Sequence, residues 1–288
     1  MHCSVNSLSA KPLPETAKVK TPDDLEKLAT LLDDENEDVA INVIAALLEH
    51  QEELGDLPAR LQEHSNELVR RRAHQLQSAI TFRNWRREFY ALLDENDPDF
   101  ETGLILLHML WFDRDSRINV ATALKNFISA AKNPARPLNT LEDARSLMCR
   151  LGFAAELEST IHPENYCIGT ILSQHCGAGS LLLGLLKTLM TEPDKFQVVR
   201  FCGEFALRDN RNTILRGIGD WRCCRLSSAQ DFEFFSQRDI LHLAGNMLLS
   251  SAVNSDSFRY VLTITRALCG DAGDGVLATF PYPYGEKN

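Results

Sequence analysis

The front of the chain alternates apolar helix faces with short acidic turns. Thr21, Pro22 and the two aspartates that follow are typical of a helix start, because threonine caps, proline suits the first turn and carboxylates favour the positive helix end. Segments 36–39 (Asn-Glu-Asp-Val) and 66–69 (Asn-Glu-Leu-Val) each follow a leucine-bearing helix and open another. This recurrence predicts two HEAT-type helical hairpins, although any amphipathic helices joined by acidic turns would give a similar pattern.

The middle of the chain repeats the helical period in longer segments. The helices expected here cover residues 88–93, 100–112 and 116–132. Prolines 134 and 137 mark a break before another helix that begins at Leu141. His108 shares the apolar face of its helix with Leu104, which is typical of a core or boundary histidine whose ring is already hydrogen-bonded.

The spacing of apolar residues changes from a helical to a strand-like period after the apolar helix that starts at Ser180. Residues 196–201 and 204–208 alternate like paired strands around Cys202 and Gly203, so the sequence predicts a β-hairpin there. We expect the Ser180 helix to pack on this antiparallel sheet. Two further short strands and two helices are expected at 213–215, 222–226, 236–249 and 257–268.

Together these patterns predict an α+β fold that is predominantly helical, with a helical-repeat N-terminal part, a core containing a small antiparallel sheet, and a C-terminal helix pair. Since HEAT-type pairs stack only on their neighbours, we expect the front hairpins to offer a groove to a protein partner. The expected divisions are a flexible leader (1–20), HEAT-like hairpins (21–80), a helical linker subdomain (81–140), the core (141–230), the helix pair (231–270) and an irregular tail (271–288).

The charge of the chain argues against a nucleic-acid partner. The formal net charge is -10 at pH 7 and the pI is about 5.3, whereas phosphate neutralisation needs a basic face. The one basic run, Arg70 to Arg72, is expected to fan out over a helix on a solvated surface, offset by Glu63 and Glu67.

The eight cysteines have no regular spacing and no secretory signal precedes them, so we expect reduced thiols in a cytoplasmic protein. The longest apolar stretch, 179–186, is far shorter than the ~20 residues that cross a bilayer. No membrane partner is therefore expected.

Residues 173–186, SQHCGAGSLLLGLL, hold the arrangement that most suggests chemistry. A thiol just before a helix is favoured as a thiolate by the positive helix end, as in many cysteine nucleophiles. The turn at 177–180 could also cradle an anion, but it lacks the lysine of a phosphate loop and no strand is expected before it. Tight packing explains its small residues more simply.

The order of several loose motifs resembles the SirB-type transglutaminase-like family. These motifs are Leu-Gly-Phe at 151–153, Pro-Glu-Asn-Tyr at 163–166, the apolar segment 168–186 and Phe-Cys-Gly-Glu-Phe-Ala-Leu-Arg at 201–208. The likeness extends over residues 81–270 and implies that the C-terminal helix pair is tetratricopeptide-like (TPR-like). It also implies a papain-like core, in which a cysteine at a helix start faces a histidine on one strand and an aspartate on the next.

The same resemblance implies that the catalytic positions are degenerate. It places Ala178 at the nucleophile position, with Cys176 two residues earlier, and it places Glu204 where the histidine would stand. A carboxylate there would raise the pKa of a neighbouring thiol. Asp209 or Asp220 could supply the acid. We therefore expect a non-catalytic protein that binds a protein or peptide, or acts as a scaffold, without a cofactor.

The competing hypothesis is a cysteine-dependent hydrolase or acyl transferase that uses Cys176, with His242 or His175 as base and Asp220 as acid. His175 is a poor base because neighbouring side chains diverge at a helix start. A metal site is a weaker alternative, since the paired Cys-x-x-Cys spacing of zinc sites is missing. Its candidate ligands would be Cys167, His175, Cys176, Cys202, Cys223 and Cys224.

Overall fold

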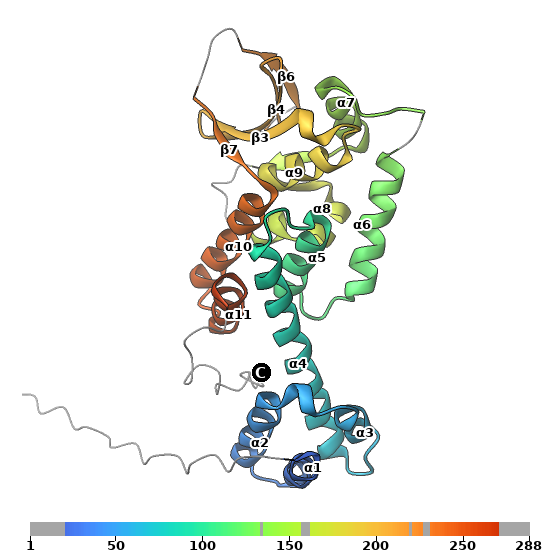
Figure 1. The fold of residues 1–288 in the computed structure, drawn as a ribbon, viewed down its shortest axis with the longest axis vertical. Coiled ribbons are helices and arrows are strands. Elements are labelled where there is room, and N and C mark those ends of the chain that lie inside the picture. The colour runs from blue at the N-terminus through green and yellow to red at the C-terminus, as the bar shows by residue number, and fades with distance from the viewer. Residues whose placement is uncertain (1–20, 133–134, 157–161, 219–220, 227–230, 271–288) are drawn as a thin grey trace, which may run out of the picture. The chain divides into compact units, whose positions relative to one another are not determined.

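The computed structural model describes residues 21–132, 135–156, 162–218, 221–226 and 231–270, so the expected leader and tail lie outside the described residues. The described chain is mostly helical and contains a five-stranded antiparallel sheet and a C-terminal helix pair (Figure 1). The α+β class predicted from the sequence is confirmed at this level. None of the described helices combines the length and the apolar character that a membrane crossing requires.

The described chain divides into two compact units at Ile80 and Thr81. Helix α4 begins in the first unit and continues without a break into the second, whereas the sequence indicated separate helices on the two sides of this point. The first unit contains α1 (Pro22–Thr30), η1 (Leu31–Asp33), α2 (Glu37–Glu49), η2 (Gln51–Glu53), α3 (Leu57–Gln62) and the start of α4 (Glu67–Asp94), where η denotes a 3-10 helix.

The two repeated asparagines cap the helices that they precede. Asn36 Oδ1 accepts a hydrogen bond from the Asp38 backbone N–H at 3.0 Å, and Asn66 Oδ1 accepts one from the Leu68 N–H at 2.9 Å. Each cap satisfies a backbone donor that has no partner within the helix. The recurrence seen in the sequence therefore encodes two equivalent helix starts.

Arg72 is buried, so the expectation of a solvated arginine run is wrong at this position. Arg72 is 3% exposed, and its Nη1 donates to the Leu32 carbonyl at 2.9 Å and to the Asp34 carbonyl. These carbonyls lie where η1 ends, and the last carbonyls of a helix have no intrahelical donor. Because consecutive residues of α4 point to different sides, one arginine of the run reaches this inner position.

The second unit is built around one large apolar core that all of its long helices enter. The sheet and α10 lie on either side of α9 in Figure 1, and α10 pairs with α11. Besides the end of α4, the described helices of the second unit are α5 (Phe100–Trp111), α6 (Arg117–Ala131), α7 (Leu141–Leu151), η3 (Pro163–Tyr166), α8 (Ile168–Gln174), α9 (Gly179–Leu189), η4 (Pro193–Lys195), α10 (Gln237–Asn254) and α11 (Phe258–Cys269).

His108 on α5 is a buried residue with both ring nitrogens engaged, as its apolar helix face predicted. Nδ1 accepts from the Gly169 backbone N–H at 3.3 Å, which leaves Nε2 to donate to Asp115 Oδ2 at 2.9 Å. Burial lowers the pKa of His108 because it penalises the charged ring, and Asp115 opposes this shift. This histidine holds α5 to α8 and has no nitrogen left for catalysis.

The five-stranded sheet has the order β6-β5-β4-β3-β7, and every neighbouring pair is antiparallel. Its strands are β3 (Phe196–Phe201), β4 (Glu204–Asp209), β5 (Thr213–Arg216), β6 (Arg222–Arg225) and β7 (Glu233–Phe235). The predicted hairpin is confirmed, and Cys202 and Gly203 both take positive φ (51° and 82°), as a tight hairpin turn requires. Helix α9 packs on β3 and β4 as expected. Strand β7 was not predicted.

A second sheet of two parallel strands was also not predicted. Strand β1 (Ala154–Glu156) pairs with β2 (Cys176–Ala178), with Ala154 opposite Cys176 and Glu156 opposite Ala178. Contrary to the sequence-based expectation, a strand leads directly into α9, and it contains Gly177 and Ala178, the first two residues of the expected turn. A Cβ on Gly177 would lie 2.7 Å from Ile171, so close packing against α8 explains this glycine.

Candidate functional site

Cys176 lies on a strand rather than at a helix start. It opens β2, and the capping residue of α9 is Ala178, two positions later. The electrostatic effect of a helix end is confined to its first turn. The thiol is therefore outside the position at which α9 would favour a thiolate most strongly.

The carboxylate that Cys176 meets is Glu156. Glu156 and Ala154 share one face of β1, and Ala154 is the residue opposite Cys176. The thiol donates to Glu156 Oε1 at 3.5 Å. Partial burial raises the pKa of Cys176, and the hydrogen bond and charge of Glu156 raise it further. The sequence analysis predicted that a carboxylate would raise the pKa of this thiol. It named Glu204 as that carboxylate, which was wrong, because the residue beside Cys176 is Glu156.

Neither candidate base is available to Cys176. His175 adopts φ of 55°, its Nδ1 donates to the Leu151 carbonyl at 2.6 Å, and its ring stacks on Phe153 at a centroid distance of 4.9 Å. His242 lies on α10, where burial lowers its pKa, and within the described residues no hydrogen bond or ion pair joins it to Cys176. The structure does not assemble a cysteine and histidine pair at this place.

The side chains at the positions that the resemblance identifies as degenerate make structural contacts where they are described. Ala178 is buried and ends β2. Glu204 forms an ion pair with Arg216 on the neighbouring strand β5. Asp209 Oδ1 accepts from the backbone N–H groups of Arg211 and Thr213, both at 2.8 Å, and so shapes the turn from β4 to β5. Asp220, the candidate acid, lies outside the described residues.

The six candidate metal ligands do not form a cluster in the part of the chain that is described, where no three His, Cys, Asp or Glu side chains converge as an ion would require. Burial raises the pKa of Cys167 well above its ordinary value, and that of Cys223 is raised to about 12. Thiols with such pKa values stay protonated near neutral pH and are poor nucleophiles and ligands.

Replacing Glu156 with glutamine should make Cys176 more reactive. The substitution removes the negative charge that raises the pKa of the thiol, so a larger thiolate fraction is present at pH 8 and alkylation by iodoacetamide should accelerate about threefold to tenfold. Mass spectrometry of the Cys176 peptide measures the rate, and Glu192→Gln, an exposed acid elsewhere, is the control. An unchanged rate in Glu156→Gln would contradict the role given to this carboxylate.

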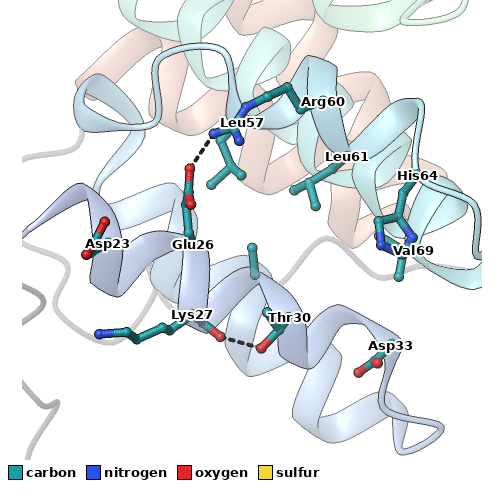
Figure 2. A pocket seen from close by; sticks show the side chains of 11 residues that line it. Asp23, Glu26, Lys27, Thr30, Asp33, Leu57, Arg60, Leu61, His64 and Val69 are labelled. Atoms are coloured by element: carbon teal, nitrogen blue, oxygen red, sulfur yellow. Dashed lines mark hydrogen bonds and ion pairs between the residues drawn. The ribbon is translucent and has the colours of Figure 1, made fainter.

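The first unit contains a groove of about 580 Å³ between α1, α3 and the start of α4 (Figure 2). Its floor consists of buried apolar side chains from all three helices: Ala29, Leu57, Leu61 and Val69. The same side chains belong to the core of this unit. The floor is thus a fixed part of the fold rather than a loop surface.

Polar side chains form the rim of the groove. Figure 2 shows Glu26 on α1 and Arg60 on α3 directed toward each other, with 2.6 Å between the Arg60 Nη2 and Glu26 Oε1 atoms. The hydrogen bond to Glu26 is the main reason that the pKa of Arg60 is raised. Both side chains are 53% exposed, so this ion pair contributes little to stability. Asp23 and Asp33 leave further exposed carboxylates along α1 and η1.

Sequence reasoning expected a groove in the hairpins but did not identify its residues. Leu57 and Leu61 are one helical turn apart and follow Asp56, a pattern that could have indicated an inward helix face beside an acid. The pairing of Glu26 with Arg60, 34 positions apart, follows only from the packing of α1 against α3.

Comparison with known proteins gives no family for this chain: no family model matches it, and no curated protein or solved structure matches it.

Proposed function

We propose that this protein is a non-catalytic scaffold that binds a basic segment of a partner protein in the groove of its first unit. Residues 21–80 contain fourteen aspartates and glutamates but only five lysines and arginines, so this unit carries most of the net charge of -10. The acidic rim above an apolar floor is the observation that carries the proposal. A peptide with lysine or arginine beside leucine-type side chains complements such a surface.

The exposed ion pair between Glu26 and Arg60 can be replaced by an ion pair between Glu26 and a partner protein. An exposed pair of this kind is worth little, so a partner's arginine can take the place of Arg60 on Glu26 at small cost. Asp56, 3.2 Å from Arg60 Nε, can hold the displaced guanidinium. Charged partners would therefore bind through rim contacts that steer the approach, while apolar contacts on the floor would hold the bound segment.

The rest of the proposal follows the resemblance found in the sequence. The second unit would be a transglutaminase-like core without catalysis, flanked by HEAT-like hairpins and the TPR-like pair α10 and α11, in a cytoplasmic protein. The hydrogen bond from Cys176 to Glu156 supports a protonated thiol and disfavours the hydrolase or acyl transferase alternative. Turnover of ester or glutamine-amide substrates that is lost in Cys176→Ala would restore that alternative.

Selection of random peptides on the full chain tests the groove. Enriched peptides should carry lysine or arginine next to apolar residues, and fluorescence anisotropy should show binding that weakens with added salt. The double variant Glu26→Gln, Asp33→Asn should weaken binding about tenfold or more, because two rim charges are lost. Glu49→Gln, an exposed acid outside the groove, is the matched control. Equal affinities for all three proteins would exclude the groove as the binding site.

A further inference from the structure

Arg266 on α11 is a buried cation with unfilled donors. It is 9% exposed, and within the described residues its Nε and Nη2 atoms have no hydrogen-bond partner. Burying a charge without a partner is strongly unfavourable, so buried charges are normally paired. An unpaired buried group of this kind calls for a ligand that fills it.

The two unfilled atoms define the shape of that ligand. In the planar guanidinium the Nε–H and one Nη2–H bond point the same way along one edge, and this edge matches two oxygens of a carboxylate or phosphate group. A single chloride would use this fork less well than two oxygens spaced to meet it. The unfilled edge of Arg266 thus has the two donors of a bidentate contact.

Helix α11 meets the second half of α4 on both sides of Arg266. The Arg259 guanidinium lies 5.6 Å from the Phe82 ring centroid, and a Cβ on Gly270 would lie 3.0 Å from the Tyr90 ring. Arg266 follows Arg259 by two helical turns and precedes Gly270 by about one, so it occupies the same stripe of α11. Arg266 therefore lies along α11 between the two points at which this helix meets Phe82 and Tyr90 of α4.

This seam between α4 and α11 is rich in positive charge. Arg86 is 8% exposed and lies one turn from both Phe82 and Tyr90. Among the described acids, Asp113 forms an ion pair with Arg259, and Glu88 of α4 forms one with Arg117. Arg86 and Arg266 therefore place two buried cations on these helices, although the chain as a whole is acidic.

We propose that Arg266 anchors an anion-binding site in this seam, which takes the phosphate or carboxylate group of a small molecule. Its burial suits a small group rather than an extended surface. This site is independent of the groove in the first unit, and either proposal can fail without the other.

Thermal unfolding of the full chain in inorganic phosphate, citrate or chloride at matched ionic strength tests the site. Saturating phosphate or citrate should raise the melting temperature by about 5 °C relative to chloride. A larger shift in phosphate identifies a phosphate group as the ligand, and a larger shift in citrate identifies a carboxylate. Arg266→Met should lose this shift. Arg266→Lys should lose most of it, because an ammonium keeps the charge without the fork. Arg87→Met, an exposed arginine of α4, should keep the full shift.

Equal shifts in wild type and Arg266→Met, or no shift in either oxyanion, would overturn the proposal. If Arg266→Met fails to fold, the comparison of wild type with Arg266→Lys decides in the same way. Calorimetric titration of phosphate into wild type and Arg266→Lys gives the affinities directly, and these should differ about tenfold or more.

Discussion

Trp221→Ala should lower the free energy of unfolding of the second unit by about 4 kcal/mol, since truncating a large buried aromatic costs about 3–5 kcal/mol. Trp221 is 2% exposed, and its Nε1 donates to the Phe153 carbonyl at 2.7 Å, across 68 positions of sequence. The alanine leaves both a cavity and a buried carbonyl without its donor. Urea titration followed by circular dichroism measures the loss.

Trp221→Phe is the matched control for that experiment. It keeps most of the ring and removes the indole N–H, so it should cost about 1–2 kcal/mol. The difference between the two variants separates ring packing from the hydrogen bond to Phe153. Equal losses in both would show that the hydrogen bond, and not the buried ring, dominates, contrary to our expectation.

Arg72→Met should destabilise the first unit by about 3 kcal/mol. Hydrogen bonds from a charged donor contribute about 1.5–3 kcal/mol each, and methionine fills similar space without donating to the Leu32 and Asp34 carbonyls. Native-state hydrogen exchange of α1 and α2 measures this effect locally, and their protected amides should exchange about 100-fold faster.

The neighbouring Arg71 provides the control. It is exposed, so Arg71→Met removes the same charge and should change stability by less than about 0.5 kcal/mol. Similar acceleration in both variants would mean that the net charge of the unit, rather than the buried hydrogen bonds, determines its stability.

The sequence predicted best where neighbouring residues determine structure. Asn36 and Asn66 cap helices through their own side chains, and Ser236 caps α10 with Asp239 in a capping box. The hairpin of β3 and β4 follows from alternating apolar residues around a two-residue turn. These features depend on interactions over a few positions, which a single sequence displays.

The sequence predicted less where distant segments meet. Strands β1 and β7 have three residues each, too few to show a period, and they form because β2 and β3 supply partners. Arg72 is buried because η1 ends beside α4. The continuity of α4 was missed because its polar and apolar residues form no clear stripe across the boundary.

The candidate site also combines features that the sequence could predict with contacts between distant segments that it could not. The sequence indicated from Ala178 and Glu204 that the catalytic positions are degenerate, which remains a prediction of the resemblance. It could not identify Glu156 as the neighbour of Cys176, because only the pairing of β1 with β2 joins residues 20 positions apart. The unfilled edge of Arg266 likewise becomes visible only when α11 is packed.

The edge strands of the five-stranded sheet affect the tendency of this protein to aggregate at high concentration. Its outermost strands are short: β6 has four residues with arginines at both ends, and β7 has three. The short strand β6 gives an incoming strand few backbone groups to pair with, and its arginines repel a like strand. Strand β7 is also short, but it carries a single charge, Glu233, beside the exposed Phe234. The β6 edge of the sheet therefore offers a poor template for strand-by-strand growth into aggregates.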